Sequence, residues 1–281
     1  MTNTKYSFDV YLHSNKMNKV AADVSKYSFL KNNSGINIYI ENLEDHEYLL
    51  QHDNQYFFRG NNKLLWDASK HQSFFPVRFF CVETHKKLKR ENKWILVCDP
   101  DIFCLSDLSS MQQYIYEAES KNKDIIAYDK LSSSMLLNTQ NIDWSEKKIV
   151  DDMFEIKNDF DNWLLLKNKD VLNMPKEYNS YDSIDSNTKL LHVSKTECQP
   201  WKTGIRYCKS DIHNRIRNNN NLKSEVFQRH PNEKIENTVF QLFKNAYKNQ
   251  YINKKDIVDN IELNGLRSDI LEICEIDLYD Y

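Results

Sequence analysis

The N-terminal part of the chain distributes apolar and polar positions in a way that predicts a strand, a helix and a second strand. Residues 7–12 carry the alternation of a strand, and residues 17–30 repeat apolar side chains at helical spacing. Gly35 then precedes the apolar stretch 36–40, which indicates the second strand. These three elements in succession form a βαβ unit, so we expect a largely parallel sheet at this end of the chain.

A short run of apolar residues, 94–98, precedes Asp99, Pro100 and Asp101 and predicts a buried strand that ends at a sheet edge. Pro100 has a fixed φ and biases Asp99 toward an extended backbone, so the three residues form a stiff corner. Ligands of α/β proteins gather at the carboxyl ends of strands, and paired carboxylates there suit a hard divalent cation. The alternative is that both aspartates only end a strand and cap the next turn.

The middle of the chain predicts further short strands and helices. We expect helices to begin at Pro76 and near Asp143, and another to follow the capping pair Ser106-Asp107 as far as Ala118. Residues 47–60 have no clear pattern, and strands are expected at 124–128, 135–137 and 190–193. The alternation of strands with helices indicates an α/β domain through this region.

The C-terminal part has a different pattern. Apolar positions over residues 231–247 share one helical face, and residues 257–263 resemble a second helix. An asparagine run at 218–221 separates them from the preceding strands and is typical of a linker. We therefore expect an α/β domain over residues 1–215 and a helical extension over residues 216–281.

Composition narrows the class of protein. The 281 residues are 40% hydrophobic, which is typical of a globular chain, and the net charge of −3 does not favour a nucleic-acid partner. The six cysteines form no CxxC pair and are expected to be reduced core residues, as in a cytoplasmic protein. No apolar run approaches the roughly 18 residues that span a bilayer. We expect a soluble cytoplasmic chain without a transmembrane segment, and peripheral membrane association stays open.

The four glycines are too scattered for a P-loop or a dinucleotide fingerprint, both of which need clustered glycines. A bound nucleotide would therefore depend on a metal, which points back to Asp99 and Asp101.

Several short motifs follow one another in an order that resembles a known family. They are Arg78-Phe79, the strand that runs into Asp99-Pro100-Asp101, the serines 132–134 before an apolar run, and His192 ahead of Gln199-Pro200-Trp201. Together they resemble the GT-A-fold glycosyltransferases, in particular the glycogenin-like and lipopolysaccharide-galactosyltransferase-like retaining family, over residues 7–204. The resemblance implies a GT-A (Rossmann-like) α/β fold with a mixed, mostly parallel sheet flanked by helices, followed here by a C-terminal helical appendage.

The same resemblance implies a metal site. Asp99 and Asp101 would be two ligands, and His192, from another strand, a third. An imidazole among oxygen ligands favours Mn²⁺ over Mg²⁺. The alternative for His192 is a core histidine whose ring is satisfied by hydrogen bonds.

The resemblance also suggests roles for residues around the metal. The candidates for binding the donor are Arg78, Ser133, Gln199 and Lys202, and Asn15 joins them only by its position after the first strand. Trp201 is a candidate for contact with the sugar or the acceptor. The candidate catalytic pair is Asp161 with Asn162. Each has a simpler alternative. Arg78 can form a surface ion pair, the lysines can be solvated, Trp201 can pack a loop onto the sheet, and Asn15 can form a turn.

The departures from the family pattern indicate a divergent branch. Gln199 stands where the family has a lysine near the diphosphate, and either Lys202 or Lys195 would have to supply that cation. Three serines replace Asn-Ala-Gly, and Asn162 replaces a glutamine. Because of these differences, the substrates of the family cannot be assigned to this chain.

The sequence thus predicts a metal-dependent glycosyltransferase, a hexosyltransferase. It would move a sugar from a nucleoside diphosphate sugar, a UDP-sugar in the first instance, to a hydroxyl acceptor on a glycan, lipid or protein, with retention. A non-catalytic protein of the same fold that binds a nucleotide sugar or glycan is the alternative, and turnover of a donor would separate the two. A phosphatase with an Asp-x-Asp motif is less favoured, because that motif normally follows the first strand and Phe103 stands where a Thr or Val is expected.

Overall fold

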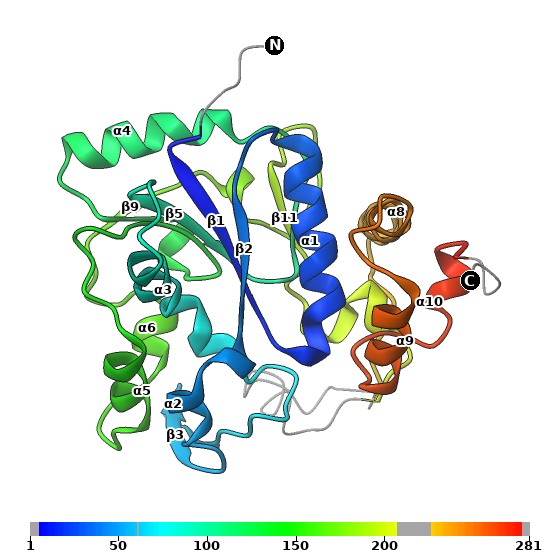
Figure 1. Cartoon of the computed structure of the whole chain (residues 1–281), viewed down its shortest axis with the longest axis horizontal. Coiled ribbons are helices and arrows are strands. Elements are labelled where there is room, and N and C mark those ends of the chain that lie inside the picture. The colour runs from blue at the N-terminus through cyan, green and yellow to red at the C-terminus, as the bar shows by residue number, and fades with distance from the viewer. Residues whose placement is uncertain (1–5, 61, 207–225, 277–281) are drawn as a thin grey trace.

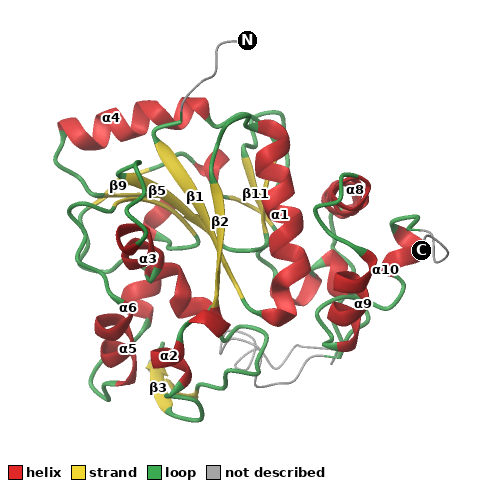
Figure 2. Cartoon of the chain, viewed as in Figure 1, coloured by secondary structure: helices red, strands yellow, loops and turns green. Residues whose placement is uncertain are grey.

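The fold is built on a six-stranded mixed sheet covered by helices on both faces (Figures 1 and 2). A computed structural model of the chain describes residues 6–60, 62–206 and 226–276. In spatial order the strands of this sheet are β2 (Ile38–Asn42), β1 (Phe8–Ser14), β5 (Trp94–Cys98), β8 (Ser134–Asn138), β7 (Ile125–Ala127) and β9 (Val171–Asn173). Only β8 runs against its neighbours, so the prediction of a mixed, mostly parallel α/β sheet is confirmed.

The predicted βαβ unit is present at the N-terminal end. β1 and β2 pair in parallel, and helix α1 (Lys19–Asn32) connects them. β1 continues two residues past its expected end at residue 12, because His13 and Ser14 are also buried and paired with β2. This extension places a histidine at the edge where β5 ends.

Alternate residues of the central strands enter two separate cores. Trp94 and Leu96 pack with α1 and with helix α4 (Gln112–Ser120) on one face of the sheet. Ile95 and Val97 pack on the other face with the segment from Phe74 to Val82 and with helix α5 (Glu146–Phe154). Burial on both faces explains why residues 94–98 are apolar without interruption.

A smaller three-stranded sheet stands beside the main one. It contains β10 (Ser180–Tyr181), β11 (Leu190–His192) and β6 (Ile102–Cys104), in that order. β6 begins directly after Asp101, and β11 is the late strand that the sequence predicts. The chain therefore changes sheets at the Asp-Pro-Asp corner.

Some elements differ from their predicted extents. The helix expected from Ser106 begins only at Gln112, after a short 3-10 turn at Ser109–Met111, because the Asp107 carboxylate accepts the backbone N–H of Ser109 and holds a turn instead of capping a helix. Proline 76 does begin a helical segment, which is the 3-10 helix Phe75–Phe79 followed by α3 (Cys81–Lys87). The patternless residues 47–60 form α2 (Glu47–Leu50) and the first strand of a hairpin, β3 (Tyr56–Arg59) with β4 (Asn62–Leu65).

The C-terminal part is helical, as predicted. Its helices are α8 (Glu233–Lys248), α9 (Lys254–Glu262) and α10 (Ile270–Ile273), and they lie beside α1 at one side of the sheet (Figure 1). Val239 and Phe243 of α8 share a buried cluster with Val20 and Val24 of α1 and with Trp201. The predicted linker at 218–221 and the boundary at 215 lie outside the described residues, so the division into two domains stays a prediction.

None of the helices in the described part of the chain has the length and apolar character needed to cross a bilayer.

Candidate metal and donor site

Three strand ends meet at one edge of the main sheet. The pairing of β1 with β5 places Leu12 opposite Cys98, so both strands end together and His13 comes to lie near Asp99. β8 is antiparallel to β5 and places Ser134 opposite Cys98, so this strand begins where its neighbour ends. The reversal of β8 thus brings the serine-rich turn to the aspartates, and the Asp99 N–H donates to the Ser133 carbonyl at 3.0 Å.

His192 reaches the same place through the smaller sheet. β11 runs antiparallel to β6 with His192 opposite Ile102, the residue that follows Asp101. The Val193 N–H donates to the Asp101 carbonyl over 3.0 Å, which fixes the end of β11 against the Asp-Pro-Asp corner. Two segments that are far apart in the sequence are therefore held together by backbone pairing.

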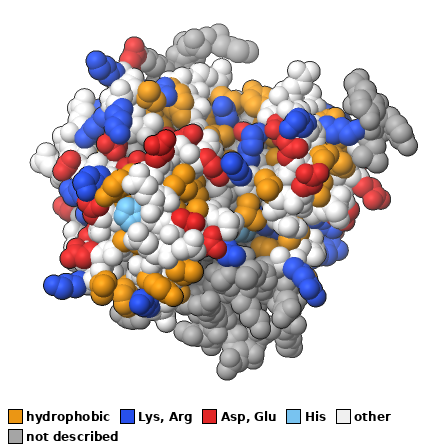
Figure 3. Space-filling view, turned by 60° about the horizontal axis from the view of Figure 1, so that its bottom comes forward, with side chains coloured by type: hydrophobic (Ala, Val, Ile, Leu, Met, Phe, Trp, Pro, Cys, Tyr) orange, Lys and Arg blue, Asp and Glu red, His pale blue; other side chains and the backbone are white. Residues whose placement is uncertain are grey.

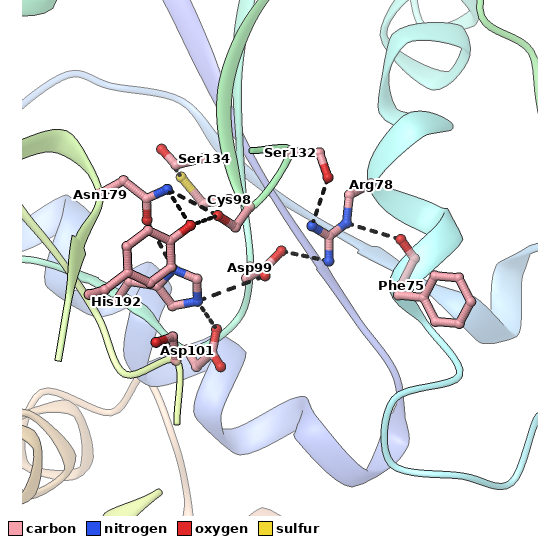
Figure 4. Close-up of polar contacts among 12 residues, drawn as sticks. Phe75, Arg78, Cys98, Asp99, Asp101, Ser132, Ser134, Asn179 and His192 are labelled. Carbon is pink, nitrogen blue, oxygen red and sulfur yellow. Dashed lines mark hydrogen bonds and ion pairs between the residues drawn. The ribbon is translucent and has the colours of Figure 1, made fainter. Parts of the chain in front are cut away.

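The side chains of Asp99, Asp101 and His192 form one cluster of potential metal ligands (Figure 4). Each offers a ligand atom, and these atoms lie within 4.8 Å of one another. His192 Nε2 is 3.4 Å from Asp101 Oδ1 and 3.9 Å from Asp99 Oδ2. Burial opposes a charge on the His192 ring, but the carboxylates of Asp101 and Asp99 outweigh it and raise the pKa of His192. The cluster therefore attracts a cation.

Asp99 is held in its ionised form by two further side chains. Arg78 Nη2 lies 2.9 Å from Asp99 Oδ1, and His13 Nε2 lies 3.0 Å from the same oxygen. Burial alone would favour the neutral acid, yet the Arg78 guanidinium and the His13 hydrogen bond lower the pKa of Asp99 to about 2. Arg78 is itself fixed, since its Nε donates to the Phe75 carbonyl at 3.0 Å and its Nη1 to Ser132 Oγ at 3.2 Å.

Asp101 has a different partner. Gln199 Nε2 donates to Asp101 Oδ2 over 2.8 Å, from a side chain that is only 4% exposed. The neutral amide orients this carboxylate without adding a positive charge. Oδ1 of Asp101, which faces His192, remains for a cation.

A cavity of about 530 Å³ opens beside the cluster. Its wall contains the three candidate ligands, and the residues that also line it include Arg59, His71, Phe74, Arg78, Ser133, Asp161, Tyr181, Gln199 and Trp201. Arg59 Nε lies 3.0 Å from Asp161 Oδ1, so the β3–β4 hairpin and helix α6 (Asp161–Leu164) meet in this wall. The volume is in the range of pockets that bind small molecules.

The structure places most, not all, of the predicted site residues at this cavity. Asn15 caps the 3-10 helix Lys16–Asn18 and bonds the 70–73 loop behind the wall. Lys202 is 1% exposed and donates to Asn18 Oδ1 at 3.1 Å. Asn162 is exposed and does not line the cavity. Their roles in donor binding and catalysis stay predictions, as does contact of a sugar with Trp201, whose ring is 1% exposed and packs on Phe103 and Phe243.

Sequence reasoning missed four residues of the site. Asn179 accepts from His192, Tyr181 packs on the His192 ring, Arg59 pairs with Asp161, and His71 lines the cavity. Arg59 lies in a stretch without a clear pattern. Tyr181 belongs to a strand of only two residues, and Asn179 lies just before that strand. No periodic signal could have found Asn179 and Tyr181, because the pairing of β10 with β11 is what brings this segment to His192.

The donor set fits a divalent metal. Two carboxylates and one imidazole are ligands that Mn²⁺ accepts, and a site richer in oxygen also suits Mg²⁺. Viewed from the edge at which β1 ends, acidic and basic side chains intermix on the visible surface of the described residues (Figure 3).

Comparison with known proteins adds a likeness of fold. No family model matches the sequence, and no curated protein matches it. Among solved structures, the glycosyltransferase GlyE of Streptococcus pneumoniae TIGR4 aligns at 14% identity and a TM-score of 0.45, over 69% of this chain and 56% of GlyE. An active-site mutant of LgtC aligns at 10% identity and a TM-score of 0.43, over 73% of this chain and 93% of LgtC. Mouse xyloside xylosyltransferase 1 aligns at 11% identity and a TM-score of 0.39, over 67% of this chain and 98% of the other.

These three proteins are glycosyltransferases by name, and this chain spans about half the length of GlyE. The likeness concerns the fold alone. The chemistry of this chain has to be inferred from its own side chains.

Proposed function

We propose that this chain is a metal-dependent glycosyltransferase that moves a hexose from a nucleoside diphosphate sugar to a hydroxyl acceptor. The observation that carries the proposal is the convergence of Asp99, Asp101 and His192 within 4.8 Å at the wall of a cavity of about 530 Å³. We infer Mn²⁺, or else Mg²⁺, as the metal, a UDP-sugar as the donor and retention as the stereochemical outcome. The acceptor would be a hydroxyl of a glycan, a lipid or a protein.

The metal, when bound, would neutralise the negative charge that develops on the leaving diphosphate. Asp99, Asp101 and His192 would hold it. Arg78 and His13 keep Asp99 charged, and Gln199 orients Asp101. These contacts form the site before a ligand arrives, which reduces the reorganisation that binding requires.

Asp161 is the predicted catalytic side chain that faces the cavity. Its carboxylate is oriented by Arg59, and both side chains lie in the wall with the metal ligands. A carboxylate in that position can accept hydrogen bonds from sugar hydroxyls and stabilise positive charge on the sugar ring. The predicted partner, Asn162, would need to turn toward the ligand to take part.

A non-catalytic protein that binds a nucleotide sugar is the second candidate. Arg59 and Arg78, two cations of the cavity wall, each pair with a carboxylate of that wall. The positive charge available to the diphosphate would then come chiefly from the metal. A bound metal would hold the diphosphate of a donor whether or not the sugar is transferred, so this arrangement is compatible with a binding protein as well as with an enzyme.

Donor binding and turnover can be measured separately. Thermal shifts with UDP-, GDP- and CMP-sugars, each with and without Mn²⁺, would identify a donor, because a ligand that binds only the folded state raises the melting temperature. Release of free nucleotide from that donor in the presence of candidate acceptors would then establish transfer, and the anomeric configuration of the product would test retention. Binding of a donor without release of nucleotide would favour the non-catalytic protein, and no Mn²⁺-dependent shift with any donor would contradict both.

A further inference from the structure

The side chain of Asn179 connects the metal ligands to two hydroxyl groups of the cavity wall. Asn179 is fully buried, and its Oδ1 lies 2.9 Å from His192 Nδ1. Its Nδ2 donates to Ser133 Oγ at 3.0 Å and to the Tyr181 hydroxyl at 3.1 Å, and these two hydroxyls are 2.8 Å apart. Four polar contacts therefore form one closed network.

Hydrogen counting determines which way the amide faces. With Oδ1 toward His192, the ring supplies one hydrogen, the amide supplies two, and one hydroxyl supplies the fourth, so all four contacts are hydrogen bonds. If the amide were reversed, its oxygen would face both hydroxyls. Three contacts would then share two hydroxyl hydrogens, and one short contact would have none.

The first consequence concerns His192. A carboxamide oxygen only accepts, so Nδ1 of His192 must carry the hydrogen, and in the neutral ring the lone pair is on Nε2. Nε2 is the atom that lies 3.4 Å from Asp101 Oδ1. A histidine ligand is commonly fixed in this way by an acceptor on its other nitrogen.

The second consequence concerns the hydroxyl pair. Each hydroxyl accepts one amide hydrogen, and one of them donates to the other. One hydroxyl hydrogen of the pair is then left over. Because Ser133 and Tyr181 both line the cavity, this hydrogen is available to an oxygen atom of a ligand.

We propose that Asn179 is a positioning residue that presents the unprotonated Nε2 of His192 to the metal and leaves one hydroxyl hydrogen of Ser133 or Tyr181 to bind a donor oxygen. This inference rests on the proposed function for the identity of the ligands. The network itself does not depend on that function. The oxygen would belong to a phosphate or to a sugar hydroxyl, since both accept a hydrogen bond.

Three variants separate the two consequences. Asn179→Asp keeps an oxygen acceptor for His192 Nδ1 and loses the two amide donors. Asn179→Leu has similar size and loses both functions, and the double variant Ser133→Ala/Tyr181→Phe removes both hydroxyls. Asn138→Leu is the matched control, because Asn138 is also buried but lies at the opposite end of β8, where its amide donates to Asp124.

Mn²⁺ binding, measured by calorimetry without nucleotide, tests the first consequence. We expect Asn179→Leu to bind Mn²⁺ about 10- to 100-fold more weakly than the unaltered chain. Asn179→Asp should stay within a few fold, and Asn138→Leu should lower the melting temperature without changing Mn²⁺ affinity. Unchanged Mn²⁺ affinity in folded Asn179→Leu, or equal losses in Asn179→Leu and Asn179→Asp, would overturn the positioning role.

The position of the proton can be observed directly. Nitrogen-15 spectra of histidine-labelled, metal-free protein at alkaline pH, assigned with His192→Gln, should show a protonated Nδ1 and a bare Nε2 for His192. A hydrogen on Nε2 would overturn the inference even if Asn179→Leu does not fold. Failure of the unaltered chain to bind Mn²⁺ would instead contradict the metal-dependent function and the metal-presenting role, and the spectrum would still decide the orientation of Asn179.

The hydroxyl pair is tested by donor affinity. Either single substitution would still leave one hydroxyl hydrogen for the ligand, so both hydroxyls have to be removed together. The double variant Ser133→Ala/Tyr181→Phe should weaken binding of the donor found by thermal shift and keep Mn²⁺ affinity within a few fold, because Oδ1 of Asn179 still faces His192. Donor affinity of the folded double variant equal to that of the unaltered chain would overturn the second consequence.

Discussion

The side-chain amide of Gln199 donates to Oδ2 of Asp101 over 2.8 Å, so a residue predicted to contact the donor also orients a candidate metal ligand. A lysine here would reach the same carboxylate as a cation. Compared with the lysine of the family that the motifs resemble, glutamine removes a positive charge beside Asp101 and keeps a hydrogen bond to it.

Gln199→Lys is expected to weaken Mn²⁺ binding, because an ammonium group beside Asp101 competes with the metal for the carboxylate. Gln199→Leu should weaken it less, since it removes one hydrogen bond to the carboxylate, worth about 1.5–3 kcal/mol, and adds no competing charge. Calorimetric titration with Mn²⁺ would rank the three proteins. Stronger Mn²⁺ binding in Gln199→Lys than in Gln199→Leu would contradict this account of Asp101.

Asp101→Asn should abolish the Mn²⁺-dependent part of donor binding, and EDTA should have the same effect on the unaltered chain. The fold should survive, since Asp101 lies at a strand end and is only partly buried. Asp129→Asn is a suitable control, because this exposed aspartate has a φ of 49° that asparagine also tolerates. Donor affinity that is equal in Asp101→Asn and Asp129→Asn would remove Asp101 from the site.

Arg78→Met should destabilise the chain by about 1–3 kcal/mol, because it leaves the partly buried carboxylate of Asp99 without its cation. Arg78→Lys should cost less, since a lysine can restore the charge but cannot make the three separate contacts of the guanidinium. Urea denaturation in EDTA would measure both losses. A loss below about 1 kcal/mol in Arg78→Met would show that Asp99 does not depend on this pair.

We expect the stability of the chain to depend on pH through His46, a side chain that is separate from the cluster of candidate metal ligands. Burial opposes its charge, but hydrogen bonds with Glu146 and Glu41 raise the pKa of His46 to about 9. A group whose pKa is raised on folding stabilises the protein fully below its unfolded pKa of about 6.5, and this contribution is lost as the pH rises through 9. The difference in unfolding free energy between the unaltered chain and His46→Gln should therefore shrink by up to about 3 kcal/mol from pH 6 to pH 10.

Chemical denaturation at several pH values would measure this difference. Glu146→Gln removes one of the two carboxylates and should flatten the dependence. A difference that stays constant over the same range would mean that His46 is neutral in the folded chain.

Removal of residues 231–281 tests the proposed division of the chain near residue 215. Phe243 of α8 packs on Trp201 and shares a buried cluster with Val20 of α1, so the truncated chain would expose apolar surface of the main domain. We expect it to lose stability and to bind hydrophobic dyes. Phe243→Ala should cost about 3–5 kcal/mol in the full chain. A truncated chain as stable as the full one would support an independent extension.

The sequence alone determined the local elements and one half of the site. The βαβ unit and β5 follow from patterns within single segments, and the Asp99-Pro100-Asp101 corner follows directly from the end of β5. Such features depend on neighbours in the sequence, and apolar periodicity records which faces of those segments are buried.

The tertiary structure determined the rest of the site, namely the position of His192 and the partners of the site residues. His192 could be placed beside the aspartates only by resemblance, and it is the antiparallel pairing of β11 with β6 that brings it there. The partners Asn179 on His192, Gln199 on Asp101 and Arg59 on Asp161 join segments that are distant in the sequence. A single polar side chain in a loop has no periodicity, and whether it faces a cavity, a neighbour or water depends on strand pairings that the local sequence does not encode.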